Sequence, residues 1–188
     1  MHVMMRKILI VSLCAQKMHE EEFVRPIVEI IGEKNCIVKH YSLFGKKDLT
    51  KATKVILSGT SLQDFAYLED LEKFAWLKDF DKHVLGICAG MQVLVKTFDG
   101  SLKKQQEIGV VEVKMKNGLF GLPSDFRAYT LHNLGVDKLG AFEVLGKSDR
   151  GIHVVKHKKK DIYGMMFHPE VLQKGMLGEF AKHGTRKN

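Results

Sequence analysis

Cys88 lies between two glycines at a spacing that suits a reactive cysteine. The sequence Gly86-Ile87-Cys88-Ala89-Gly90 continues the apolar run Val84–Ile87 and leads into a second apolar run that begins at Met91. A strand, a sharp turn and a helix in this order form a nucleophile elbow, which holds a nucleophile in strained backbone geometry above a sheet. Small residues are needed there because a Cβ would collide with the neighbouring backbone. The motif alone fits a reactive cysteine and a buried core cysteine equally well.

A histidine and a glutamate follow a second predicted strand. Tyr163–Phe167 is apolar and leads into His168-Pro169-Glu170. The carboxyl ends of parallel strands lie at one edge of a sheet, so Cys88 and His168 can meet there. Cysteine, histidine and carboxylate would then serve as nucleophile, general base and orienting group. We therefore predict a triad of Cys88, His168 and Glu170, in preference to a structural histidine at a strand end.

Alternating apolar strands and amphipathic helices are expected to position these residues. This alternation predicts an α/β fold, a three-layer, mostly parallel mixed sheet with flanking helices. In the first half of the chain we expect strands at Lys7–Leu13, Cys36–Tyr41 and Lys54–Leu57, and helices at Glu20–Ile31 and Asp64–Phe80.

The second half of the chain predicts further strands, several of them antiparallel. The expected strands are Glu107–Met115, Arg127–His132, Phe142–Leu145 and Ile152–Val155, and a closing helix is expected at Val171–Ala181. The apolar alternation slips by one place at Val110-Val111, which is compatible with a β-bulge. We expect the last strand of this mixed sheet to deliver His168.

Composition and length indicate an ordinary globular protein. The 188 residues suit a single domain over residues 1–188, with 45% hydrophobic and 28% charged residues. No segment approaches the ~20 apolar residues of a membrane-spanning helix, so no membrane partner is expected. Met1–Lys7 leads straight into a strand, unlike a signal peptide. The three cysteines, Cys14, Cys36 and Cys88, form no disulfide or metal pattern, and a reducing cytoplasm is expected.

The net charge of +8 raises nucleic acid as a partner. The densest basic run, Lys156–Lys160, falls between two predicted strands and lacks interleaved aromatic residues for base stacking. We interpret it as a charged hairpin turn, with a docking patch for an acidic partner as the alternative, and expect no nucleic acid. His153 and His157 fall on a strand and its turn, so their rings should not converge on a metal. No metal or cofactor is predicted.

Four segments resemble the class I (triad) glutamine amidotransferases. Gly86–Gln92 resembles the family's G-I-C-x-G-x-Q, and Tyr163–Glu170 resembles its Y-G-x-Q-F-H-P-E, with Met166 where glutamine is usual. Glu107-Ile108-Gly109 resembles E-x-G, and Leu119–Pro123 resembles L-F-x-x-x-P. The resemblance covers nearly the whole chain. Among subfamilies it is greatest to the stand-alone glutaminase subunit of archaeal two-subunit GMP synthase.

The resemblance implies a fold, an activity and a set of site residues. The fold would be flavodoxin-like, and the activity would be hydrolysis of glutamine to glutamate and ammonia through a thioester on Cys88. The oxyanion hole would comprise Ala89, Gly59 and Thr60, and the substrate contacts would be Gln92, Leu131 and His132. A structural role for His132 is equally compatible with the sequence. The ammonia would pass to an ATP-dependent synthetase subunit that aminates XMP to GMP.

The chain departs from the family pattern at two places. Thr60 and Ser61 stand where glycine and proline are usual, and Leu131 stands where a polar residue is common. If position 60 required a positive φ, threonine would be strained there. Two other functions share the same triad or fold, a γ-glutamyl hydrolase or peptidase and a catalytically silent regulatory module. Activity on γ-glutamyl peptides but not on glutamine would favour the first of these.

Overall fold

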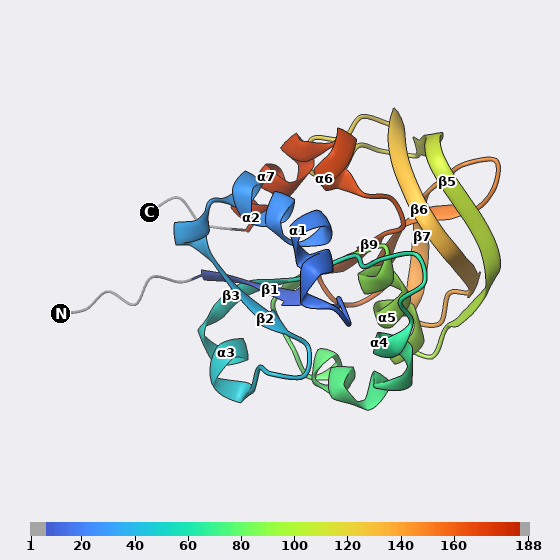
Figure 1. Cartoon of the computed structure of the whole chain (residues 1–188). Helices are drawn as coiled ribbons and strands as arrows, with labels where there is room; N and C mark the ends of the chain where they lie inside the picture. Colours follow the sequence, from blue (N-terminus) through green and yellow to red (C-terminus); the bar gives the residue numbers. More distant parts are fainter. Residues whose placement is uncertain (1–6, 185–188) are drawn as a thin grey trace.

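The computed structural model describes residues 7–184, which form one nine-stranded sheet with helices on both faces (Figure 1). The expectation for the start of the chain concerns Met1–Lys7, of which Met1–Arg6 lie outside the described residues. The strands are β1 Lys7–Ser12, β2 Cys36–His40, β3 Ala52–Leu57, β4 His83–Ile87, β5 Ser101–Met115, β6 Asp125–Lys138, β7 Phe142–Lys147, β8 Ile152–His157 and β9 Ile162–Met165.

Most of the helices are short. The α-helices are α1 Glu20–Phe23, α2 Arg25–Ile31, α3 Lys46–Lys51, α4 Ala66–Glu69, α5 Ala89–Thr97, α6 Pro169–Leu172 and α7 Lys174–Lys182, and the 3₁₀ helices are η1 Lys17–His19, η2 Glu33–Asn35 and η3 Leu71–Lys78. None of those within residues 7–184 has the length and apolar character needed to span a membrane.

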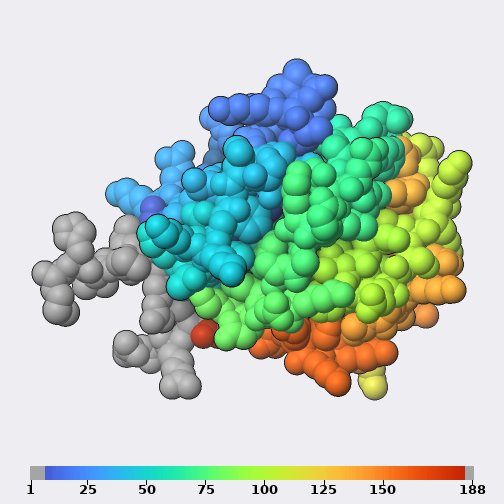
Figure 2. Space-filling model, turned by 90° about the horizontal axis from the view of Figure 1, so that it is seen from below, coloured from blue at the N-terminus to red at the C-terminus, as the bar shows by residue number. Residues whose placement is uncertain are grey.

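The alternation of side chains along β1 divides the core into two layers. Ile8 and Ile10 pack on one face of the sheet with residues of α2 and α7, whereas Leu9 and Val11 pack on the other face with residues of η3 and α5. Side chains of a strand point alternately to opposite faces, so a continuous apolar strand needs helices on both sides. The predicted three-layer α/β architecture is confirmed. Figure 2 shows one face, where the cyan-to-green segment with α3, α4 and η3 lies beside the yellow-green and orange strands.

The sheet has a parallel half and an antiparallel half. Its strand order is β2-β1-β3-β4-β9-β8-β7-β5-β6. The five strands from β2 to β9 run parallel, and the pairs from β9 onward are antiparallel. We call β5 and β6 the ribbon: they pair with each other over most of their length and curve away from the rest of the sheet in Figure 1. Of the basic run Lys156–Lys160, the last three residues lie in the predicted turn between β8 and β9, whereas Lys156 and His157 end β8.

The helix predicted at Asp64–Phe80 is wrong, because this segment forms α4 and η3 instead. The side chain of Asp64 accepts hydrogen bonds from the backbone of Ala15 and Ala66, and that of Asp70 accepts from Tyr41. The local bond from the Ala66 N–H to Asp64 is of the kind that competes with helix formation, and Asp70, with φ of −104° and ψ of 30°, separates α4 from η3. Of the apolar side chains in this segment, Tyr67, Phe74, Leu77 and Phe80 are buried.

The other two predicted helices are each divided as well. Glu20–Ile31 is interrupted at Val24 because Pro26, in the first turn of α2, has no N–H to donate to the preceding turn. Gly32, with φ of 92°, closes α2. Val171–Ala181 divides at Gln173 into α6 and α7.

The predicted bulge at Val110-Val111 is also wrong. β5 begins at Ser101, and its pairing with β6 continues without a shift through Val110 and Val111, whereas the register shifts between Lys104 and Glu107. Ile108 and Val110 lie on the exposed face of the ribbon. The slip in the apolar pattern therefore reflects apolar side chains on an exposed face and not an extra residue.

Candidate active site

Cys88 lies in the sharp turn between β4 and α5. Its backbone has φ of 49° and ψ of −104°, a strained conformation for a residue with a side chain. The turn depends on both glycines, since a Cβ on Gly86 would lie 2.5 Å from the carbonyl carbon of Gly90, and one on Gly90 would overlap the backbone of Leu57. The backbone N–H of Cys88 donates to Met165 at 2.7 Å, which fixes the elbow to the end of β9.

His168 and Glu170 form a buried pair just after β9. His168 Nδ1 lies 2.8 Å from Glu170 Oε1, and the two residues are only 2% and 3% exposed. Pro169 starts α6, and the backbone N–H of His168 donates to the carbonyl of Tyr129 on β6 at 2.8 Å. Within residues 7–184 the other ring nitrogen, Nε2, makes no hydrogen bond. The ring is therefore oriented on one side and has a free nitrogen on the other.

Cys88, once ionised, acts on the two ionisable side chains around it. Burial alone would lower the pKa of His168, but the negative charge of an ionised Cys88 and of Glu170 outweighs burial, and the pKa is raised well above 6.5. Burial raises the pKa of Tyr67, and charge on Cys88 raises it further. The structure thus brings Cys88, His168 and Glu170 together in one electrostatically coupled group.

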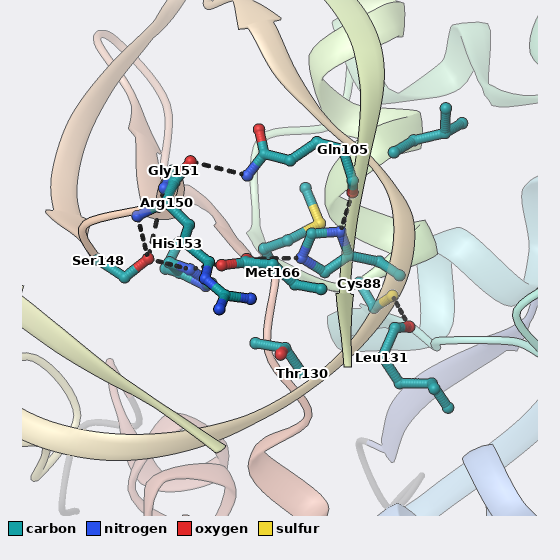
Figure 3. A network of polar contacts seen from close by, with 12 residues as sticks. Cys88, Gln105, Thr130, Leu131, Ser148, Arg150, Gly151, His153 and Met166 are labelled. Atoms are coloured by element: carbon teal, nitrogen blue, oxygen red, sulfur yellow. Dashed lines mark hydrogen bonds and ion pairs between the residues drawn. The ribbon is translucent and has the colours of Figure 1, made fainter. Parts of the chain in front are cut away.

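The sulfur of Cys88 faces the ribbon. Its thiol donates to the carbonyl oxygen of Leu131 at a Sγ–O distance of 3.5 Å, a contact that Figure 3 shows as a dashed line. Cys88 is 4% exposed, so the sulfur is nearly closed off from solvent. Leu131 thus contacts the nucleophile through its backbone, for which the identity of its side chain is not decisive.

The loop after β3 lies against the histidine without strain at Thr60. A Cβ on Gly59 would lie 2.7 Å from His168 Cε1, so this position has no room for a side chain. Thr60 does not have a positive φ, and its hydroxyl donates to Asp64 Oδ2 at 2.7 Å. Threonine therefore fits the loop. Ala89 is the first residue of α5, where a backbone N–H has no acceptor within the helix.

Gln92 lies one turn beyond Cys88 and is bonded inside the protein. Its Oε1 accepts a hydrogen bond from the hydroxyl of Tyr67, and its Nε2 donates to the carbonyl of Leu134 at 3.1 Å and contacts the sulfur of Met166 at 3.8 Å. The sequence analysis did not identify Tyr67 as a partner of Gln92. Met166, which replaces the usual glutamine, provides this sulfur contact.

The histidines singled out in the sequence point to different places. The Nε2 of His132 lies 3.1 Å from Oε2 of Glu107, so its ring faces a buried carboxyl group. His153 contacts the same carboxylate, a role that the sequence reasoning missed, although its place in a buried strand was a signal. His157 instead packs against Phe98, so the two rings of the H-x-x-x-H do not converge.

A surface hollow lies beside the Thr60 loop and not over Cys88. It is lined by residues of the β1–η1 connection and of the loop that leads into α4, among them Gln16, His19, Gln63 and Asp64. Cys88, His168 and Glu170 do not line it. Polar side chains therefore line a hollow next to the Thr60 loop.

Comparisons with known proteins identify the family of the chain. The family model for glutamine amidotransferase class-I matches residues 20–184. The A subunit of the glutamine-hydrolyzing GMP synthase of Methanococcus maripaludis strain C5 is 37% identical over 150 residues, covering 76% of this chain and 69% of the relative. The protein of the same name from Methanosphaera stadtmanae is 26% identical, covering 83% of this chain and 86% of the relative.

Solved structures share the fold. A putative A-subunit protein of GMP synthase from Thermoplasma acidophilum superposes with a TM-score of 0.79 at 25% identity, covering 94% of this chain and 92% of that one. A glutamine amidotransferase from Thermotoga maritima gives a TM-score of 0.68 at 19% identity over 90% of this chain and 79% of that one, a likeness of fold.

Proposed function

The chain belongs to the class I glutamine amidotransferase family, and on this premise we propose that it is the glutaminase subunit of a two-subunit GMP synthase. It hydrolyses glutamine, and a separate ATP-dependent synthetase uses the ammonia to aminate XMP. The names of its curated relatives support this acceptor. The three cysteines are free thiols, in keeping with a reducing cytoplasm as the place of action.

One observation carries the proposal: a cysteine with strained backbone is electrostatically coupled to a buried histidine, whose Nε2 has no hydrogen-bond partner among the described residues and whose Nδ1 is held by Glu170. In the proposed triad Cys88 is the nucleophile, His168 the general base and acid, and Glu170 the orienting group. Negative charge on Glu170 and Cys88 favours the protonated imidazole, the form that a proton-transfer step needs.

The proton passes through His168 in each half of the reaction. Cys88 gives its proton to His168 Nε2, and its sulfur attacks the carboxamide carbon of glutamine. His168 then protonates the leaving nitrogen, which departs as ammonia and leaves a γ-glutamyl thioester. A water molecule gives a proton to His168 as it attacks the thioester, and that proton returns to the sulfur as glutamate leaves.

The negative oxygen of each tetrahedral intermediate needs preorganised donors. We assign one to the backbone N–H of Ala89, which has no acceptor within α5. The second comes from the Gly59–Thr60 loop, which packs directly against His168. Because Asp64 holds the side chain of Thr60, the loop is ordered for this role by its own side chains.

The proposed substrate contacts differ in kind. Leu131 contributes its carbonyl oxygen, which already lies beside the sulfur. Gln92 contacts substrate only if it gives up one of its internal hydrogen bonds. His132 supports the backbone beside the sulfur, because its ring nitrogens are engaged by Gln105 and Glu107.

Glutamate release from glutamine tests the function. We would compare wild type, Cys88→Ala and Cys36→Ala, each alone and in the presence of XMP with a candidate synthetase. Cys36 is a buried cysteine on β2, so its variant controls for loss of a thiol as such. We expect turnover in wild type and Cys36→Ala only. Absence of turnover from wild type in both conditions would refute the proposal, and activity on γ-glutamyl peptides alone would favour a γ-glutamyl hydrolase.

A further inference from the structure

A buried polar cluster joins His132, the chain neighbour of Leu131, to Glu107 and His153, two residues that the mechanism does not use. Glu107 is 1% exposed, His132 2% and His153 0%. A single oxygen, Glu107 Oε2, lies 3.1 Å from His132 Nε2 and 3.2 Å from His153 Nε2. Titratable groups removed from water are stable only when each is paired or neutral. The position of the protons in this cluster therefore matters.

The partners of His132 determine where its protons lie. Nδ1 is 3.1 Å from the carbonyl oxygen of Gln105, which only accepts hydrogen bonds, so Nδ1 carries a hydrogen. A neutral ring then has a lone pair on Nε2, which faces Glu107 Oε2. A bare carboxylate there would place two acceptors against each other. One proton must therefore lie between Glu107 and His132.

Burial favours the uncharged form of this pair. Burial raises the pKa of Glu107, against the opposing charge of Arg150. Burial lowers the pKa of His132 to about 4, and the charge of His168 lowers it too. Burial likewise lowers the pKa of His153 to about 4, and its Nε2 also lies 3.0 Å from the hydroxyl of Ser148. A neutral carboxyl of Glu107 thus donates to His132. Because His132 is then uncharged, it does not repel the positive charge of a protonated His168.

The cluster also joins the ribbon to the rest of the sheet. Within residues 7–184, β5 pairs with β7 only at Lys114 and Met115. At ~3.3 Å per residue these lie about 23 Å along the strand from Glu107. Near Glu107 the connection is made by side chains, through His153 on β8 and through Gln105, whose Nε2 donates to the carbonyl of Arg150 at 3.1 Å (Figure 3).

We propose that Glu107 is a positioning residue for the reaction at Cys88, because by sharing a proton with His132 and contacting His153 it holds the Leu131 carbonyl beside the sulfur. That carbonyl accepts the thiol hydrogen in the resting site and an N–H of the carboxamide when substrate binds. The contact with substrate rests on the proposed glutaminase function. The arrangement of the cluster and the bond from the thiol to the Leu131 carbonyl do not.

Nitrogen-15 NMR of the histidine rings in the full chain tests the proton assignment. The His132 signals are assigned as those lost in His132→Asn. We expect this ring to carry its hydrogen on Nδ1 and to stay neutral between pH 5 and 8. Added zinc should leave the signals unchanged, since no metal site is predicted here. A ring that titrates near the ordinary value of about 6.5, or that carries its hydrogen on Nε2, would overturn the proposal. This result does not depend on turnover, so it separates the cluster from the glutaminase assignment.

Glu107→Gln and Glu107→Leu separate the hydrogen bond from the packing. The amide of glutamine still donates to His132 Nε2, so kcat/KM for glutamine should stay within about threefold of wild type, whereas leucine should lower it at least about tenfold. Since glutamine cannot ionise, the ratio of Glu107→Gln to wild-type activity should rise with pH.

Equal activities of the two variants, whether both high or both low, would contradict the proposal, as would a ratio that does not change with pH. Glu112→Gln, on the same strand but exposed, is the matched control and should retain wild-type activity. Circular dichroism of each variant establishes that it is folded. Where Glu107→Leu does not fold, Glu107→Gln and the ring NMR of wild type decide the matter.

Discussion

The parallel half of the sheet and the ribbon hold their site residues by different means. Cys88 and His168 follow β4 and β9, which are neighbours joined by a regular ladder from Val84–Ile162 to Ile87–Met165. Leu131 lies on the ribbon, where the described contacts with the rest of the site are separate hydrogen bonds, such as that from Gln92 to the Leu134 carbonyl. Backbone ladders do not titrate, whereas the side-chain links through Glu107, His132 and His153 depend on protonation.

The largest effect is expected from a substitution in the turn between β4 and α5. Gly86→Ala should abolish glutaminase activity and lower the free energy of unfolding by at least about 3 kcal/mol, since its Cβ meets backbone 2.5 Å away. Gly109→Ala on the ribbon should cost about 1–2 kcal/mol, because Gly109 has φ of 112° but open space around it. Urea unfolding measures both. Equal losses would show that close packing does not distinguish the two halves.

A substitution in the pair formed by His168 and Glu170 should have the next largest effect, and it should lower activity without changing folding. Glu170→Gln should lower kcat about 10²-fold to 10⁴-fold, since an amide no longer stabilises the charged imidazole. KM for glutamine should change less. The exposed Glu112→Gln again provides the control. A Glu170→Gln enzyme with wild-type kcat would remove Glu170 from the triad.

At acid pH, the stability of the fold should depend on the protonation of His153, which links the ribbon to β8 through Glu107. His153 has a pKa of about 4 in the folded chain and 6.5 as its ordinary value, so the unfolded state binds the extra proton between these values. Stability from this group is present above pH 6.5 and lost as pH falls toward 4, with a slope approaching 1.4 kcal/mol per pH unit, roughly one proton's worth.

Two neighbouring groups act in the opposite direction. The raised pKa of Glu107 and that of His168 both make stability fall as pH rises above the ordinary values of these groups. The contribution of His153 is therefore measured as the difference in slope between wild type and His153→Leu in urea unfolding from pH 4.5 to 7.5. Parallel curves for the two proteins would show that His153 is not buried in its neutral form.

The smallest expected effect concerns Tyr67, which supports Gln92 from below the elbow helix. Tyr67→Phe leaves Gln92 Oε1 without its donor and should cost about 1–3 kcal/mol. Tyr41→Phe, whose hydroxyl donates to the partly exposed Asp70, should cost less than about 1 kcal/mol. Thermal unfolding measures the two. If the order were reversed, the buried hydrogen bond of Gln92 would not stabilise the site.

Local patterns predicted the parallel half well and the connecting segments less well. The strands around Ile10, Ile56 and Leu85 were evident because a strand buried on both faces is a continuous apolar run. The helix expected at Asp64–Phe80 was not found, since aspartate side chains bond to distant backbone that no local pattern reveals. Exposed apolar residues on the ribbon, such as Ile108, disturbed the apolar alternation and led to the wrong prediction of a bulge.

The sequence by itself determined the chemistry of the candidate site, because each part of it is local. The glycines around Cys88 permit the turn, and His168 and Glu170 are two residues apart and directly bonded. Only the tertiary structure decided what surrounds that chemistry. Glu107 meets His153 across strands that are not neighbours in the sheet, and the proton that Glu107 shares with His132 follows from burial, which no single segment of the sequence specifies.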